Sequence, residues 1–383
     1  MIKKERRIIY LAGFLFALPF ALTSYINSSF LESYMETKYV GLVYIIASII
    51  TIFGLVEISR ILRNIGNRNA TMLFSLVTLF SLIGMAFLKQ QLLIVICFIL
   101  YFVSASFIMV SLDIFIEELS KAREIGRIRG TYLVIANLAW VLSQAISGSI
   151  IAKSSYKGIY LFSALFMGLV AGIFILFLKN FEDPLYKKIS LLKTIKLFLK
   201  DKNISKIYII SFILKFFYAW MVIYTPIYLH QYLHFGWDKI GLIFTIMLIP
   251  FVILDMPLGR LSDKIGEKKM LIVGLFITTF FTLIIPFVTT MDWKIWAMIL
   301  FGTRVGAAAI EVMSDNYFFK IVTAEKADVI VFFRNTSSLS YIIGPLIAIP
   351  ILLYIPSFKY LFFVLGAILL SGVLISIRLK EVK

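Results

Sequence analysis

The chain has 383 residues, of which 61% are hydrophobic and only 15% are charged, whereas soluble domains average roughly 45–50% apolar and ~25% charged residues. A soluble protein of this size has too little interior to bury so much apolar surface, so lipid must surround most of the chain. The formal net charge of +17 would also suit a nucleic-acid-binding protein, but the positions of the basic residues argue against that partner. The single cysteine, Cys97, excludes an intramolecular disulfide and any CxxC motif.

The N-terminal segment begins with basic residues and continues into an apolar run that reaches about residue 27. This order resembles a secretory signal peptide. Since the run is long and a second span follows closely, we expect a retained first helix.

Twelve apolar runs are long enough to cross a bilayer, which takes about 20 residues in helical form. Barrel strands are about half that length and alternate in polarity, so the runs predict an all-α membrane protein. The first six predicted spans lie at roughly 8–28, 40–58, 70–88, 92–113, 131–151 and 158–178. The second six lie at roughly 207–229, 240–257, 270–290, 295–317, 332–354 and 359–377.

The loops divide the basic residues unequally. With the N-terminus inside, 29 of the 38 Lys and Arg residues fall in inner segments and seven in outer loops. This asymmetry predicts that both termini face the cytoplasm. It also accounts for the net charge as a topology signal and an attraction to anionic lipid, so no nucleic-acid partner is expected.

The six-plus-six order predicts two pseudo-symmetric six-helix bundles, 1–178 and 207–383. Between them, residues 179–206 carry apolar side chains at helical spacing among eight lysines, which predicts an amphipathic linker on the inner membrane surface. A faint repeat supports duplication: Ile65-Gly66 recurs as Ile265-Gly266, and Asp113 recurs as Asp315.

The segment after the eighth span carries a recognisable pattern, and its glycines would permit tight turns at both ends of a loop. Asp263 could accept hydrogen bonds from a helix N-terminus. The segment resembles the G-x-L-x-D-x-x-G-x-[KR]-[KR] loop signature of the major facilitator superfamily. The residues of this segment that we single out are Gly259, Arg260, Asp263, Gly266 and Lys268; Arg260 occupies a position that the signature leaves open.

This resemblance implies the superfamily's fold, with a central cavity lined mainly by spans one, four, seven and ten. It also implies secondary transport of a small solute. The equivalent first-half loop departs from the signature, with Ser59 in place of Gly and Arg63 in place of Asp, which indicates a divergent member.

Ionisable residues inside a membrane are costly unless they are paired or wetted, so each is a functional candidate. Arg304, Glu311 and Asp315 fall on one stripe of the tenth span at 100° per residue. Lys215 and Tyr218 lie together on the seventh span. We hypothesise that Lys215, Arg304 and Tyr218 bind an anionic or zwitterionic solute, with Glu311 as a proton-sensitive partner.

Structural alternatives stay open for these residues. Glu311 or Asp113 could simply neutralise Arg304, as a static pair or an intracellular gate. Lys215 could extend to the inner interface. Among uncharged groups, Asn27, Asn137 and Gln144 are further candidates for solute contact, although Asn137 and Gln144 are equally suited to join helices.

No Walker loop, zinc-protease motif or nucleophile elbow occurs, so we expect neither an enzyme nor a cofactor, and no bound metal. The predicted function is secondary transport of a small organic solute across the cell membrane by a monomer, with proton coupling left open. The alternative is a membrane-embedded enzyme acting on a lipid or lipid-linked substrate. Neither the solute nor the choice between uptake and efflux follows from the residues.

Overall fold

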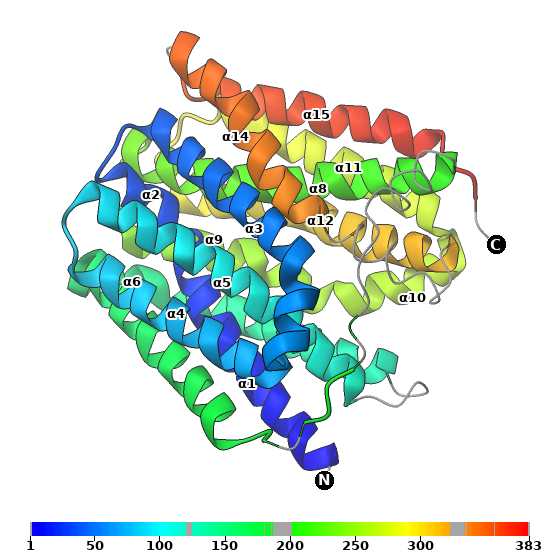
Figure 1. Ribbon diagram of the computed structural model, residues 1–383. Helices are drawn as coiled ribbons and strands as arrows, with labels where there is room; N and C mark the ends of the chain where they lie inside the picture. Colours follow the sequence, from blue (N-terminus) through cyan, green and yellow to red (C-terminus); the bar gives the residue numbers. More distant parts are fainter. Residues whose placement is uncertain are drawn as a thin grey trace. The chain divides into compact units, whose positions relative to one another are not determined.

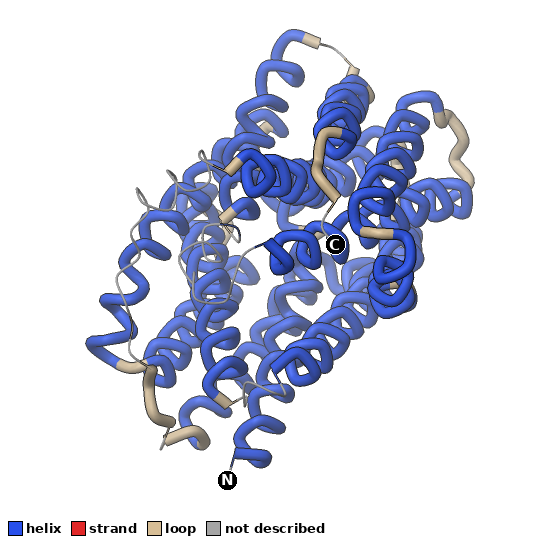
Figure 2. The backbone as a smooth tube through the Cα atoms, turned by 90° about the vertical axis from the view of Figure 1, so that its right-hand side faces the viewer, coloured by secondary structure: helices blue, strands red, loops and turns tan. Residues whose placement is uncertain are grey.

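The computed structural model describes residues 2–119, 125–179, 181–184, 186, 201–321, 333, 335–355 and 357–381. Within this part of the chain every regular element is a helix (Figures 1 and 2). The chain divides into two compact units. Unit 1 comprises residues 1–188 with 236–241, and unit 2 comprises residues 189–235 with 242–383.

In its described residues, unit 1 contains the first six helices of the chain. Their bounds are α1 (Ile2–Ser24), α2 (Asn27–Glu32), α3 (Thr37–Ile65), α4 (Asn67–Phe87), α5 (Gln91–Glu118) and α6 (Ile125–Leu176). The long helix α6 is interrupted at Ser155, where φ is 58°, so it supplies the two spans predicted at 131–151 and 158–178.

Unit 2 contains the remaining elements, apart from the first residues of α9. They are α8 (Lys202–Ile227), the π-helix η1 (Tyr228–Tyr232), α9 (Trp237–Ile253), α10 (Asp255–Ile265), α11 (Glu267–Ile284), the 3₁₀ turn η2 (Ile285–Phe287), α12 (Trp293–Ile321), α14 (Thr336–Tyr354) and α15 (Tyr360–Ile377). Because α8 begins at Lys202, the last five residues of the predicted linker belong to this helix; residues 187–200 lie outside the described part.

The lengths and apolar surfaces of these helices confirm the predicted membrane fold. Among the described residues, ten helices are long and apolar enough to cross a bilayer, α6 among them as one long element. Division of α6 at Ser155, together with the 17-residue α9, gives the twelve predicted spans. Phe53 and Phe276 leave 70% and 62% of their surface exposed, which suits contact with lipid rather than water.

The two halves repeat one backbone feature closely. Gly66 ends α3 and precedes α4, with φ 77° and ψ 156°. Gly266, 200 residues later, ends α10 and precedes α11 with φ 90° and ψ 146°. This region of backbone space is accessible essentially only to glycine. The sequence repeat noted at these positions therefore corresponds to a repeated turn.

Small residues allow a close helix contact in unit 2, between α11 and α12. A side chain added at Gly306 would lie 2.4 Å from the carbonyl oxygen of Gly274 and 2.7 Å from the amide nitrogen of Thr278. The Thr278 hydroxyl donates to the Gly274 carbonyl at 2.9 Å. In lipid there is no hydrophobic driving force between helices, so close packing of the two backbones must hold α12 against α11.

Candidate functional site

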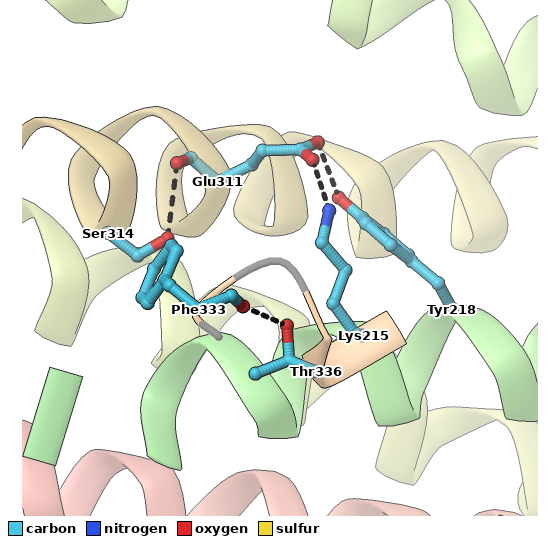
Figure 3. Close-up of polar contacts among 6 residues, drawn as sticks. All are labelled: Lys215, Tyr218, Glu311, Ser314, Phe333 and Thr336. Carbon is cyan, nitrogen blue, oxygen red and sulfur yellow. Dashed lines mark hydrogen bonds and ion pairs between the residues drawn. The ribbon is translucent and has the colours of Figure 1, made fainter. Parts of the chain in front are cut away.

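A polar contact between α8 and α12 forms the centre of the candidate site. Lys215 Nζ donates to Glu311 Oε1 at 2.6 Å, and the Tyr218 hydroxyl donates to Glu311 Oε2 at 3.1 Å. Figure 3 shows both α8 side chains directed at the same carboxylate on α12. Lys215 and Tyr218 are three residues apart and so share a face of α8, as their spacing predicted.

Arg304 lies on the same stripe of α12, about two helical turns before Glu311. Its side chain is 1% exposed. The guanidinium carbon lies 4.8 Å from the ring centre of Phe217 and 5.6 Å from that of Tyr218. Stacking on aromatic faces suits the planar, weakly hydrated guanidinium. Both Arg304 and Glu311 thus reach Tyr218, which confirms that they share one face of α12.

The local backbone around Glu311 is supported from two sides. The Ser314 hydroxyl donates to the main-chain oxygen of Glu311 at 3.1 Å. Close by, the Thr336 hydroxyl donates to the main-chain oxygen of Phe333 at 2.9 Å (Figure 3). The ring of Phe333 stacks on that of Phe318, with centroids 3.9 Å apart. These contacts tie the C-terminal part of α12 to the start of α14.

A second carboxylate acts on this cluster. Asp255, the first residue of α10, interacts electrostatically with Glu311 and with the Tyr218 hydroxyl. The cluster thus contains two cations, Lys215 and Arg304, and two carboxylates, Glu311 and Asp255. When all four groups are ionised, its net charge is zero.

One predicted residue of unit 1, Asn27, lies among buried, uncharged polar groups. Asn27 begins α2, is 4% exposed and accepts a hydrogen bond from the Tyr160 hydroxyl at 2.9 Å. The Thr23 and Tyr101 hydroxyls are 2.6 Å apart. These groups surround the interruption between α1 and α2 and join three segments of unit 1.

The two amides predicted on the fifth span both lie on α6. Gln144 is 1% exposed, and its Nε2 donates to the Ala21 carbonyl at 2.6 Å, so it links α6 to α1. Its Oε1 has no hydrogen-bond partner in the described part of the chain. Asn137 is half-buried on the same helix. The contact of Gln144 fits the helix-joining role that the sequence left open.

The two repeated aspartates occupy different units. Asp113 is exposed on α5, and Asp315 is half-buried on α12, one turn beyond Glu311. Glu311 directs its carboxylate to Lys215 and Tyr218, whereas the sequence offered it as a partner for Arg304. The pairing of Lys215 also differs from the alternative in which its amine extends to the inner interface.

The loop motif requires one correction. We expected a tight turn at each of its glycines, but α10 runs through Asp255–Ile265, so Gly259, Arg260 and Asp263 lie in a helix. The expectation for Gly259 was wrong because the preceding Pro-containing segment continues as a helix. Only Gly266 forms a turn, and Lys268 follows it in α11.

Sequence reasoning missed two residues of the cluster. Phe217 gives no sign of its role, because one more phenylalanine in an apolar span is ordinary. Asp255 could have been found, since it is an acidic residue inside the predicted span 240–257. In the described residues, no group of three or more His, Cys, Asp or Glu side chains could hold a metal ion.

Comparisons with known proteins give a consistent result. The family model described as Major Facilitator Superfamily matches residues 9–239 and 231–383. A protein of Staphylococcus aureus (strain COL) named for proline/betaine transport is 25% identical over 180 residues, which are 44% of this chain and 37% of that relative. The match thus spans little more than a third of the relative's length.

Two solved structures share the fold. The nucleoside transporter NupG superposes with a TM-score of 0.80 at 10% identity, over 98% of this chain and 99% of that one. An auto-inhibited peptide transporter of the POT family superposes with a TM-score of 0.79 at 11% identity, over 99% and 98% of the two chains. Identities this low show a common fold and nothing about the solute.

Proposed function

We propose that this chain, which belongs to the Major Facilitator Superfamily and is a secondary solute transporter, carries a small zwitterionic organic solute by alternating access. The observation that supports this solute class is the cluster of Lys215, Tyr218, Arg304 and Glu311 in unit 2. Charged groups at mid-membrane depth are costly and typically mark a solute or ion pathway.

The balance of charge favours a zwitterion over a simple anion. Lys215 and Glu311 already neutralise one another, and the second cation, Arg304, and the second carboxylate, Asp255, both act on Tyr218. A solute with net charge would leave the site unbalanced in a medium of low dielectric constant, where an unpaired charge costs several kcal/mol. A solute with one carboxylate and one cationic group can pair with both signs and leave the total unchanged.

The carboxylate and the cationic group of such a solute each have a partner of suitable chemistry in the cluster. The Arg304 guanidinium is a planar donor that suits a carboxylate. The Tyr218 ring and the Glu311 carboxylate suit a cationic group, including a quaternary ammonium. The name of the Staphylococcus aureus relative agrees with this class, since proline and betaine are both zwitterions.

Glu311 is the proposed proton-sensitive group. Its present cationic partner is Lys215, and a carboxylate that loses its cationic partner binds a proton more readily. Asp315 and Asp113 are proposed as gating or proton-handling groups near the inner ends of their helices. Asn27, Asn137 and Gln144 remain proposed solute contacts in unit 1.

Several broader properties complete the proposal. The protein spans the membrane many times. The cell membrane as its location, a cytoplasmic position for both termini and a monomeric state are proposed from the distribution of basic residues and from the family. The membrane-embedded enzyme, the second candidate from the sequence, has no support among the comparisons.

The experiment that tests the proposal measures uptake into vesicles reconstituted with the purified protein and free of ATP. Betaine and choline form a matched pair, because both carry a trimethylammonium group and only betaine has a carboxylate. We expect saturable uptake of betaine, or its competition by another zwitterion, and no saturable uptake of choline. Preference for choline, or for a simple anion such as acetate, would contradict the zwitterionic class.

Variants of the cluster locate the site. Arg304→Lys keeps the charge and removes the planar, stacked guanidinium, so we expect the apparent affinity for the solute to fall about tenfold or more. Lys294→Met removes a cation from the exposed start of α12 and serves as the matched control. Equal transport by wild type and Arg304→Lys would remove this cluster from the solute site.

A further inference from the structure

The segment that follows α6 is bound to the Gly66 turn by two opposed contacts in unit 1. Asp183 Oδ1 accepts a hydrogen bond from the backbone amide of Asn67, the first residue of α4, at 2.7 Å. In the opposite direction, Arg68 donates through Nε to the Phe177 carbonyl at 2.9 Å and through Nη2 to the Ile175 carbonyl at 2.8 Å. We call this pair of contacts the clasp.

Each contact satisfies groups that a helix end leaves without partners. The first amides of α4 point out of the helix, and a carboxylate there is favoured both as a hydrogen-bond acceptor and by the helix dipole. The last carbonyls of α6 likewise favour a cation, which Arg68 supplies. The turn at Gly66 and the end of α6 therefore cap one another, although about 110 residues separate them in sequence.

Apolar contacts hold the same segment in place. The Phe181 ring meets the Phe115 ring edge-on, with centroids 4.5 Å apart. Tyr186 packs against the hydrophobic cluster of Ile58, Leu62, Ala70 and Phe107. Its hydroxyl donates to Asp183 Oδ1 at 2.5 Å. Burial and the neighbouring Asp183 carboxylate raise the pKa of the Tyr186 phenol, so the phenol remains a donor at neutral pH.

The corresponding turn of unit 2 is held differently. At Gly266 the buried carboxylate belongs to Glu267 of α11 itself, and it pairs with Lys320 at the end of α12 at 2.6 Å. The segment after α15 offers main-chain oxygens, which Lys206 and Tyr317 approach at 2.5 and 2.8 Å. Only at the Gly66 turn of unit 1, among the described residues, does the capping carboxylate come from the segment that follows the last helix of the unit. This segment leads into the inter-bundle segment.

We propose that Asp183 is a positioning residue that fixes the start of the inter-bundle segment to α4 and thereby sets the rate of conformational exchange during transport. The role in transport rests on the proposed alternating access. With the clasp intact, α4 and the end of α6 move as one body, and the chain that joins the two halves is anchored at Asp183. Without it, the start of the inter-bundle segment keeps only its apolar contacts through Phe181 and Tyr186.

The test compares Asp183→Ala, Asp183→Asn and a control, Glu182→Ala, which removes the adjacent exposed acid. Hydrogen exchange of the first-turn amides of α4 reports the clasp directly and requires no solute. Loss of an N-terminal cap should raise exchange there by about threefold to thirtyfold in Asp183→Ala. Asp183→Asn, which keeps an acceptor oxygen, should restore part of the protection, and Glu182→Ala should match wild type.

Solute uptake then tests the role in exchange. We expect Asp183→Ala to lower kcat severalfold with KM within twofold of wild type, and Asp183→Asn to recover part of the rate. Faster hydrogen exchange with unchanged kcat would reduce Asp183 to a structural cap and overturn the proposal. A change in KM equal to that in kcat would overturn it as well, because it would mean an effect on the solute site. Unaltered hydrogen exchange would refute the clasp itself, whether or not any solute is transported.

Discussion

Gly66 and Gly266 have a positive φ angle and allow a controlled test of backbone strain. Asp183 lies beside Gly66, whereas no side chain or backbone atom lies close to the Cβ position of Gly266. Replacing either glycine with alanine forces a side chain into a region that costs about 1–3 kcal/mol. Alanine also restricts the unfolded chain, which raises the free energy of unfolding by roughly 0.4–1 kcal/mol and offsets part of this cost. At Gly266 an added Cβ meets no atom within 4 Å, so Gly266→Ala should lose about 1–2 kcal/mol from backbone strain alone.

At Gly66 the same change has a second consequence. The added Cβ would lie 2.7 Å from Asp183 Oδ2, so the carboxylate must move and the cap on α4 is lost. Such a cap contributes about 0.5–2 kcal/mol. Gly66→Ala should therefore be the less stable of the two variants, with a total loss of about 1.5–4 kcal/mol.

Thermal unfolding of the purified protein in detergent, followed by tryptophan fluorescence, measures the order of the variants. Gly168→Ala is the control, because Gly168 lies inside a helix with open space around it. It should unfold at or slightly above the wild-type temperature. If Gly66→Ala unfolds at the same temperature as Gly168→Ala, Gly66 does not form the positive-φ turn. If Gly66→Ala unfolds at the same temperature as Gly266→Ala, the Asp183 contact contributes nothing to stability.

Three further predictions concern packing and pairing in the two units. Gly306→Ala should abolish folded, monodisperse protein in size-exclusion chromatography, since its Cβ would strike backbone atoms of α11, whereas Gly344→Ala, with nearest atoms at 4.0 Å, should be tolerated. Because the ion pair is only partly buried, Lys215→Met and Glu311→Gln should each lower stability by only about 1–2 kcal/mol. The double variant should lose less than the sum, since both single variants remove the same pair. Strictly additive losses would argue against the ion pair. Tyr160→Phe should cost about 1 kcal/mol through the lost bond to Asn27, while Tyr354→Phe, at a residue 84% exposed, should leave the unfolding temperature unchanged.

The membrane fold could be predicted because lipid imposes a length and a composition on every span. The bend at Ser155 was anticipated as a loop between two spans, and the repeated Ile-Gly pairs correspond to repeated turns. Helical periodicity also predicted that Arg304 and Glu311 would share a face. A period of 3.6 residues fixes which side chains lie together on one helix.

The partners of these side chains could not be predicted, because they depend on how helices pack. Periodicity does not say which face of α8 meets α12, so the pairing of Glu311 with Lys215 emerged only from the structure. Gly259 was expected in a turn, yet nothing in a glycine prevents a helix from continuing through it. Asp183 gave no signal, since its partner amide lies 116 residues away.

The solute-binding role of the α8–α12 cluster is the central claim, and equilibrium binding tests it most directly. Titration calorimetry of betaine, or of the zwitterion found by the uptake screen, would compare wild type with Arg304→Lys and Lys294→Met. The account predicts a dissociation constant at least about tenfold weaker for Arg304→Lys and unchanged for Lys294→Met, with all three proteins unfolding at similar temperatures. Equal binding by a folded Arg304→Lys would contradict it.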